Sequence, residues 1–346
     1  KEPTVADYVS LPEYSQVAAS RNGRALIARV PVNGRFNLAV IDLESMTRRM
    51  LTSYTDRDVI AVDFAGNDRI VYRTSTADRD DEDVDGSSAL HMVTRDGARR
   101  VTLFDPDKEA GPAGNRVGRS MRLSRLLPAS EAEVLVTANL RDPLSLDIYR
   151  VNLDTGQRTL LTESRPEGVL RYVYDRARVA RAAVSTVRGT TTRVVYFRPS
   201  EAAAWQEIAR YDLTRPGTIE PINFTADGRR LRVATNATGE RMALHYFDPE
   251  ARKLLQEIFA HTSGDVASDA RGGSNHMVSV SIDAETEEVL GHLVRNDKQR
   301  PTWNTEDDRR FQRLLDRFLP DTYNSATSLR RNTSLVSAVS PTWPTT

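Results

Sequence analysis

The sequence predicts an all-β chain built from repeated units of four antiparallel strands, the pattern of a β-propeller blade. A strand–turn–strand pattern recurs with turns at positions 42, 96, 154, 198, 248 and 297, which are steps of 54, 58, 44, 50 and 49 residues. A second hairpin precedes several of these turns in the same phase, so each period holds two hairpins. The units lack the 3.6-residue apolar periodicity of a helical solenoid.

The recurring outer hairpin is clearest over residues 146–162. An apolar strand leads into Asp154-Thr155-Gly156, where Asp can bond its own backbone and Gly tolerates positive φ. Arg158 and a second short strand follow at hairpin distance. Related copies, some degenerate, lie at 39–52, 91–103, 193–205, 244–255 and 292–298.

The inner hairpin of each unit is signalled by Gly-containing turns between apolar runs. Asn22-Gly23 separates strands expected at 16–20 and 25–30, and Asp227-Gly228 separates strands at 221–224 and 231–235. Gly23 and Gly228 are 205 residues apart, which is four steps of about 51 residues and in phase with the outer hairpins. A less regular copy covers residues 62–72.

We expect residues 1–14, with Pro3 and Pro12, to form a lead-in segment and residues 15–346 to form the propeller domain. Polar inserts at 75–88, 105–118 and 261–275 are expected to be loops, where binding surface is usually built.

One short helix is predicted late in the chain. Thr305 and Asp308 form a near capping box, and Pro320 ends the run. The apolar face that should pack on another element holds Phe311, Leu314, Leu315 and Phe318. Strands at 326–330 and 334–339 then begin a seventh unit, so the last blade is predicted to be incomplete over about 323–346.

Composition excludes several classes of function. Lys plus Arg and Asp plus Glu are 48 each, a net charge of zero, which removes the attraction on which nucleic-acid binders depend. No apolar run is long enough to span a membrane. The chain has no cysteine, which excludes disulfides, thiolate metal sites and a Cys nucleophile. The start at Lys1 suggests a processed export product or a piece of a longer protein. A periplasmic or exported location is favoured over a cytoplasmic one, although the compartment is not fixed.

No catalytic residue, metal ligand or cofactor site is predicted. Residues 272–276, Gly-Gly-Ser-Asn-His, imitate a hydrolase elbow but lack its last Gly and precede a strand, so we expect a loop. Residues 81–86 imitate a calcium loop, but its twelfth position is Met92, and we expect a solvated acidic loop.

Two other sets of polar residues favour structural roles. The histidines lack metal-ligand spacing, and we expect those in strands to be hydrogen-bonded structural residues; they are His91, His245, His261, His276 and His292. Glu285, Glu287 and Glu288 could cap a substrate's amino terminus, but a charged hairpin tip is favoured.

Taken together, the repeats resemble the N-terminal propeller of prolyl oligopeptidase family serine peptidases, in the bacterial dipeptidyl or acylaminoacyl peptidase-like branch. The most specific stretch runs from Gly291 through Trp303 and the expected helix to Leu319-Pro320. The other segments that carry the likeness are 7–24, 38–43, 224–229 and 246–248.

The resemblance implies a non-catalytic domain that precedes an α/β-hydrolase domain of the same polypeptide, docks on it and gates the entry of short peptides. The catalytic domain is expected to be absent from this chain, and this chain alone is predicted to be inactive. The residues that would contact the peptide are not assigned. The alternative is a free-standing, TolB-like propeller that acts as a protein or peptide binding scaffold, because such scaffolds share the strand–Asp-Gly–strand pattern.

Overall fold

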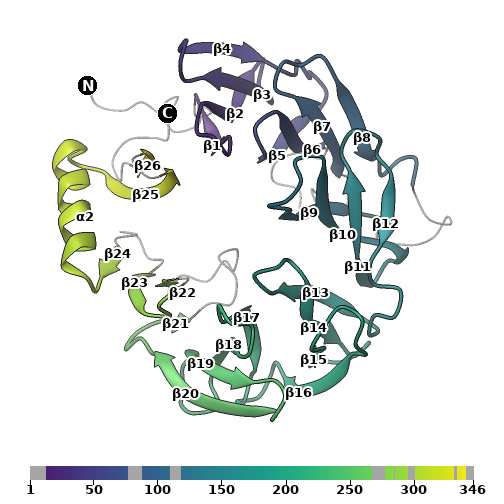
Figure 1. The fold of residues 1–346 in the computed structure, drawn as a ribbon, viewed down its shortest axis with the longest axis vertical. Helices are drawn as coiled ribbons and strands as arrows, with labels where there is room; N and C mark the ends of the chain where they lie inside the picture. Colours follow the sequence, from purple (N-terminus) through teal and green to yellow (C-terminus); the bar gives the residue numbers. More distant parts are fainter. Residues whose placement is uncertain are drawn as a thin grey trace. The chain divides into compact units, whose positions relative to one another are not determined.

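The protein was analysed as a computed structural model that describes residues 13–76, 88–109, 118–266, 277–283, 285–294, 301–330 and 333–339. Its elements follow one another as short strands, with a helix near the C-terminal end (Figure 1). The chain divides into two compact units. One consists of Lys1–Glu163, Ala326–Val336 and Thr342–Thr346, and the other of Ser164–Ser325 and Ser337–Pro341.

The first unit contains three four-stranded sheets, each a meander of neighbouring strands. The first sheet consists of β1 (Ser15–Ala19), β2 (Ala25–Val32), β3 (Arg35–Asp42) and β4 (Thr47–Met50). The second consists of β5 (Asp58–Ala65), β6 (Arg69–Ser75), β7 (Ser88–Thr94) and β8 (Arg100–Phe104). The third consists of β9 (Met121–Leu126), β10 (Glu133–Asp142), β11 (Ser145–Asn152) and β12 (Arg158–Leu160).

The second unit contains three more four-stranded sheets in chain order. They are β13 (Val169–Tyr174), β14 (Ala180–Thr186), β15 (Thr192–Phe197) and β16 (Gln206–Asp212); β17 (Glu220–Phe224), β18 (Leu231–Thr235), β19 (Ala243–Asp248) and β20 (Lys253–Phe259); and β21 (Asp265–Val266), β22 (Met277–Ile282), β23 (Val289–Val294) and β24 (Pro301–Trp303). The helix α2 (Glu306–Phe318) follows, and β25 (Tyr323–Arg330) and β26 (Thr333–Val339) pair in a two-stranded sheet.

The predicted fold class is confirmed: the chain is all-β, made of four-stranded blades of the propeller type with one late helix. The strands of each blade pair antiparallel, with one exception. The two-residue strand β21 pairs parallel to β22, with Asp265 opposite Met277. The seventh sheet has two strands where the other six have four.

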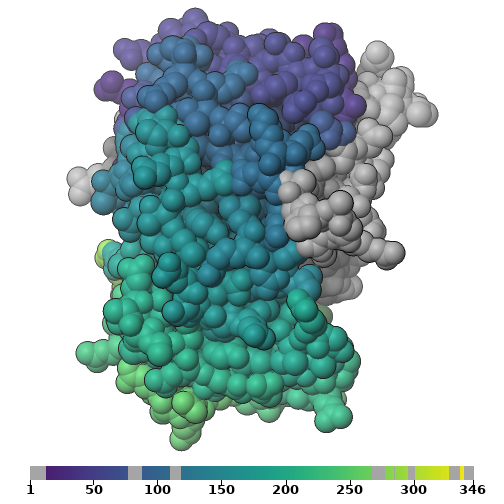
Figure 2. All heavy atoms as spheres, turned by 90° about the vertical axis from the view of Figure 1, so that its right-hand side faces the viewer, coloured from purple at the N-terminus to yellow at the C-terminus, as the bar shows by residue number. Residues whose placement is uncertain are grey.

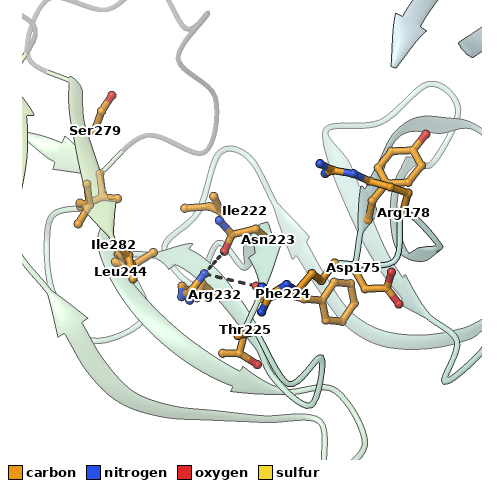
Figure 3. Close-up of a pocket in the computed structure, with 15 residues that line it drawn as sticks. Asp175, Arg178, Ile222, Asn223, Phe224, Thr225, Arg232, Leu244, Ser279 and Ile282 are labelled. Carbon is orange, nitrogen blue, oxygen red and sulfur yellow. Dashed lines mark hydrogen bonds between the residues drawn. The ribbon is translucent and has the colours of Figure 1, made fainter. Parts of the chain in front are cut away.

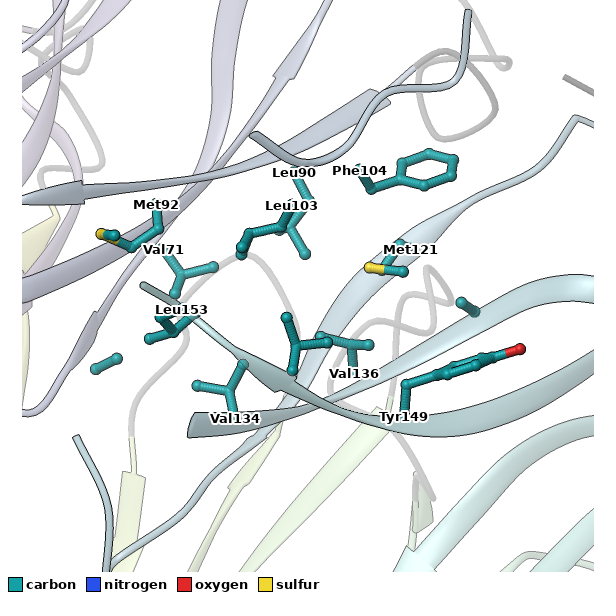
Figure 4. Packing of buried hydrophobic residues seen from close by; sticks show 13 residues of the cluster. Val71, Leu90, Met92, Leu103, Phe104, Met121, Val134, Val136, Tyr149 and Leu153 are labelled. Carbon is teal, nitrogen blue, oxygen red and sulfur yellow. The ribbon is translucent and has the colours of Figure 1, made fainter. Parts of the chain in front are cut away.

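Apolar side chains fill the space between successive sheets. In the first unit a cluster joins β6, β7 and β8 of the second sheet to β9, β10 and β11 of the third (Figure 4). Met92 and Leu90 lie on one side of it and Val134 and Val136 on the other, and all four side chains are fully buried. In the space-filling view of Figure 2 the atoms of this unit, coloured from purple to teal, pack closely on the face that is shown. Burial between sheets therefore supplies the main stabilisation of each unit.

The outer turn of the third sheet differs in detail from the sequence prediction. Asn152, not Asp154, holds the turn, because its Oδ1 accepts hydrogen bonds from the backbone N–H groups of Asp154 and Thr155 at 2.9 and 3.0 Å. The Asp154 carboxylate instead pairs with Arg69 of the neighbouring sheet, with an Nη2–Oδ2 distance of 2.7 Å. Gly156 has the expected positive φ of 74°.

The basic residue that recurs after the outer turn links neighbouring sheets of the first unit. Arg100 Nη2 donates to the backbone oxygen of Leu51 in the preceding sheet at 2.6 Å. Arg158 makes the same link one sheet later, donating to the backbone oxygen of Leu103. It also pairs with Glu109 at 2.6 Å. The repeated arginine is therefore a structural feature of the blade.

The helix α2 forms as predicted, but its apolar face is not buried. Thr305 is the N-cap, and its hydroxyl accepts a hydrogen bond from the Asp308 backbone N–H at 3.1 Å. Phe311 and Leu314 are each 45% exposed and Phe318 is 78% exposed. Leu315 is half-buried and the helix contacts β24, so the expectation that this face packs on another element is confirmed only in part within the described residues.

Candidate functional site

A cavity of about 500 Å³ lies within the second unit, at the ends of the inner strands β13, β17 and β22. Its volume is in the usual range for small-ligand sites. Its lining comes from three successive sheets and from the β13–β14 and β17–β18 turns, whose residues Asp175, Arg178 and Thr225 are labelled in Figure 3. A second cavity, of about 260 Å³, lies in the first unit and is lined by the charged residues Asp42, Arg49, Arg95 and Asp96. The cavity of the second unit has about twice that volume and a broader apolar wall, so we take it as the candidate site.

One wall of the cavity is apolar. It holds side chains from β17, β19, β21 and β22, and its members are Ile222, Leu244, Val266, Val280 and Ile282. Leu244 and Val266 are buried, each 3% exposed, and the other three pack against them. These residues belong to the apolar cluster between the fifth and sixth sheets, so the wall is held rigid by the core.

Arg232 of β18 forms the polar floor of the cavity. Its side chain is 7% exposed. One terminal nitrogen donates to Asn223 Oδ1 at 2.8 Å and to the backbone oxygen of Phe224 at 3.3 Å, as the dashed lines in Figure 3 show. The other terminal nitrogen pairs with Glu287. A buried cation needs such partners, because an unpaired charge is costly in the protein interior.

Glu287 stands apart from its neighbours Glu285 and Glu288 in the β22–β23 turn. Besides pairing with Arg232, its carboxylate accepts a hydrogen bond from the Ala226 backbone N–H at 2.7 Å. The turn is a charged hairpin tip, as predicted for all three residues, but Glu287 reaches back and links the sixth sheet to the fifth. Its carboxylate is engaged by protein groups, which argues against a role in capping a substrate amine.

The β13–β14 turn supplies the remaining charges of the lining: Asp175, Arg176 and Arg178. Asp175 accepts a hydrogen bond from the Val179 backbone N–H at 3.0 Å and lies 3.9 Å from Arg181. Arg176 is largely exposed and 3.9 Å from Glu285. In Figure 3 the guanidinium of Arg178 and the carboxylate of Asp175 leave the turn in different directions.

Arg178 differs from the other arginines of the lining in its charge partners. Among the described residues its guanidinium has no ion pair, and its Nε, like that of Arg232, is buried and makes no hydrogen bond. Its backbone has a φ of 67°, a region that long side chains rarely adopt. Of the three arginines in the lining, Arg232 pairs with Glu287 and Arg176 lies near Glu285. Arg178 is therefore the group that favours a negatively charged ligand.

The hydroxyl groups of the lining are not arranged for nucleophilic catalysis. Thr225 donates to Asp227 Oδ1 at 2.6 Å and accepts from the Arg230 backbone N–H at 3.1 Å. The Thr225 hydroxyl lowers the pKa of Asp227, with help from the Arg229 backbone N–H. Ser20 and Asn22 make a similar contact in the first inner hairpin, at 2.8 Å, so this pair is a turn motif. The other lining hydroxyls belong to Tyr174 and Ser279, and the described lining includes no histidine that could activate them.

Two of the described histidines in strands, His91 and His245, have the hydrogen-bonded structural role predicted for them. His91 lies between the hydroxyls of Thr74 and Thr102, with distances of 3.1 and 3.3 Å. Burial lowers its pKa to about 4, so the ring is neutral near pH 7. His245 contacts Thr238 and the Leu255 backbone oxygen.

His292 lies against His261 with the two rings tilted, their centroids 5.3 Å apart, and its buried Nδ1 makes no hydrogen bond. Burial and the neighbouring His261 lower the pKa of His292. Within the described residues, no group of three or more His, Asp or Glu side chains could hold a metal ion. His276, the 272–276 elbow-like string and the 81–86 acidic string lie outside the described residues.

Sequence analysis did not single out Arg178 or Arg232. A signal for Arg178 was present, because it lies 50 residues before Gly228, one repeat step away. The turn was overlooked because it lacks the glycine that marked the other inner hairpins. The contact between Arg232 and Glu287 joins residues 55 positions apart, and no local pattern indicates it.

Comparison with known proteins gives one curated relative and several structures of the same fold. Over 301 residues, 84% of the chain, the sequence is 25% identical to dipeptidyl aminopeptidase BIII of Pseudoxanthomonas mexicana. The chain spans 40% of the length of that protein. No family model matches the sequence. The relative confirms the resemblance to dipeptidyl peptidases that the sequence predicted.

Two solved structures are similar over almost the whole chain. Puromycin hydrolase matches with a TM-score of 0.55 at 15% identity, covering 97% of this chain and 51% of that one. Dipeptidyl peptidase 4 of Porphyromonas gingivalis matches with a TM-score of 0.50 at 10% identity, covering 95% and 50%. At these identities the likeness shows the fold. The part of the chain that the structure describes contains no helix long and apolar enough to cross a membrane.

Proposed function

We propose that this chain is the non-catalytic propeller part of a dipeptidyl peptidase-like serine peptidase, which binds short peptides and gates their access to an α/β-hydrolase domain of the same polypeptide. The observation that carries the proposal is the match to a dipeptidyl aminopeptidase over 84% of this chain but only 40% of the relative. The described residues present no catalytic constellation, so the chemistry is assigned to the additional domain.

The peptide-binding role is supported by the cavity of the second unit. It combines an apolar wall with charged groups, the combination that orients a small ligand in a protein site. A peptide supplies both kinds of group, because its side chains and its backbone or terminal charges alternate along a short chain. A short peptide segment can enter a cavity of about 500 Å³, whereas a whole folded protein cannot. Selection for short or unstructured peptides would follow from this size.

Docking on the hydrolase domain is supported by the exposed apolar face of α2. Phe311, Leu314 and Phe318 share one face of this helix and are exposed in the chain as described. Contiguous exposed apolar side chains of this kind often mark an interaction surface. The occupant we propose is the hydrolase domain, because the relative is more than twice as long as the matched segment.

Two measurements test this function. The coding sequence adjoining this chain should encode a hydrolase domain with a Gly-x-Ser-x-Gly elbow, and the protein that includes it should release dipeptides from the amino terminus of short peptides. This chain alone should show no such activity. If the adjoining sequence encodes no hydrolase, or if the longer protein does not cleave peptides, the peptidase function is wrong and a free-standing binding scaffold takes its place.

A further inference from the structure

Arg178 occupies a turn position that glycine holds in other inner hairpins. Its backbone N–H donates to the Asp175 backbone oxygen at 3.0 Å. Gly23 and Gly228 make the same three-residue contact with Ser20 and Thr225, at 2.8 and 2.9 Å. The φ angles of Gly23, Arg178 and Gly228 are 63°, 67° and 68°. The three turns have the same conformation, and only one carries a side chain at this position.

The side chain of Arg178 does not stabilise this conformation. Glycine adopts positive φ freely, whereas a long side chain is disfavoured there. Among the described residues no carboxylate pairs with the Arg178 guanidinium, and its buried Nε makes no hydrogen bond. Other turns also place a side chain at positive φ, at Met46, Arg252 and Glu287. Arg178 differs from Glu287 because it lines the cavity without a charged partner among the described residues, and this combination points to a functional requirement for the side chain.

The surroundings of Arg178 define what it would bind. Arg232 lies on the floor of the same cavity, while Asp175 is engaged by the Val179 backbone N–H and by Arg181. A guanidinium group recognises a carboxylate with two parallel hydrogen bonds, and the contact strengthens where water is partly excluded. The apolar wall beside it would accept an aliphatic side chain next to that carboxylate.

We propose that this cavity is a binding subsite for a peptide carboxylate, with Arg178 as its principal ligand and the apolar wall holding the adjacent aliphatic residue. This inference rests on the proposed peptide-binding function and specifies the class of peptide. The carboxylate belongs either to the C-terminus of the peptide or to an acidic side chain, since the chemistry of the contact is the same.

Isothermal titration calorimetry on this chain tests the subsite with two matched pairs of acetylated peptides. The first pair is acetyl-Ala-Ala-Val-Leu with a free carboxyl group and the same peptide as its amide. The second pair is acetyl-Ala-Glu-Leu-Ala amide and acetyl-Ala-Gln-Leu-Ala amide. Each peptide is titrated into the wild type and into Arg178→Gly, Arg178→Asn and Arg210→Ala. Arg210 is the control because it is an exposed cation on β16 that does not line the cavity.

At least one charged peptide should bind about tenfold or more tightly than its neutral partner, the effect of one charge-assisted contact. The pair that shows the difference identifies the source of the carboxylate. Arg178→Gly and Arg178→Asn should both abolish it, and Arg210→Ala should leave it within about twofold. Both substitutions suit positive φ, so the turn should fold in each.

Equal binding within both pairs, no binding of any peptide, or a preference that survives in both Arg178 variants would overturn the inference. The peptidase function is tested separately by dipeptide release from the longer protein. Cleavage with no carboxylate preference would therefore reject the subsite alone.

Discussion

Arg178 and Gly228 occupy the same position in two successive inner hairpins of the second unit, with φ angles of 67° and 68°. The hairpins lie one repeat apart, so the backbone of the blade requires a left-handed residue there irrespective of the side chain. Glycine meets this requirement without strain. Arginine is strained in this conformation, and we expect the strain to lower the free energy of unfolding.

The first prediction concerns this strain. Arg178→Gly should leave the free energy of unfolding unchanged or raise it by up to about 1 kcal/mol, because relief of the left-handed conformation offsets the greater freedom of glycine in the unfolded chain. Urea denaturation measures the change. The matched control is Gly189→Ala, at a φ of 74° where no heavy atom lies within 4 Å of an added Cβ. It should lower stability by about 1 kcal/mol from the backbone conformation alone. A clear loss of stability in Arg178→Gly would show that the arginine is a structural residue.

The second prediction concerns the link between Glu287 and Arg232. Glu287→Ala should lower the free energy of unfolding by about 2–3 kcal/mol, because it leaves a cation that is 7% exposed without its carboxylate. Glu207→Ala breaks the pair with Arg210, in which the side chains are 42% and 51% exposed. That control should cost less than about 1 kcal/mol. Equal effects of the two substitutions would contradict a structural role for the buried pair.

The third prediction concerns His91 and pH. Burial lowers its pKa to about 4 from the ordinary 6.5, so the unfolded chain binds a proton at His91 that the folded chain does not bind between these values. Its contribution to stability is present above pH 6.5 and is lost as the pH falls towards 4, by up to about 3 kcal/mol. Urea unfolding of the wild type and of His91→Gln at pH 7 and 4.5 measures the effect. The variant should lose less stability over this interval. Carboxylates titrate in both proteins, so they cancel in the difference, and parallel losses would refute the assignment.

The fourth prediction concerns the face of α2. Phe318→Ser should change the stability of this chain by less than about 0.5 kcal/mol, because the side chain is 78% exposed. In the longer protein the same substitution should lower stability by about 1–2 kcal/mol, because the hydrolase domain would bury the ring. Leu213→Ser is the control, since Leu213 is 52% exposed outside this helix. An equal effect of Phe318→Ser with and without the hydrolase domain would exclude α2 from the docking surface.

Sequence reasoning predicted what depends on local chemistry. The Gly23 and Gly228 turns, the Gly156 turn and the Thr305 cap each require only a few neighbouring residues, and the structure contains all of them. Their spacing predicted the four-stranded unit because each unit repeats the same turns.

The candidate site depends on contacts between neighbouring sheets of the second unit, and the spacing of residues in the sequence does not predict such contacts. Asp154 was expected to hold its own turn, but Asn152 does so because Asp154 has a cation partner 85 residues away. Arg178 escaped notice because its turn has Asp175 as a turn residue but lacks the glycine that marks the Gly23 and Gly228 turns. The exposed face of α2 has the pattern of a buried one, since periodicity reports that a face is apolar and not what covers it.

The most direct test of the account is a crystal structure of this chain with acetyl-Ala-Ala-Val-Leu or acetyl-Ala-Glu-Leu-Ala amide, whichever binds more tightly. The account predicts the peptide in the cavity of the second unit, its carboxylate hydrogen-bonded to the Arg178 guanidinium and its aliphatic side chain against Ile222 and Val280. A peptide bound elsewhere, or bound in this cavity with its carboxylate directed away from Arg178, would contradict it.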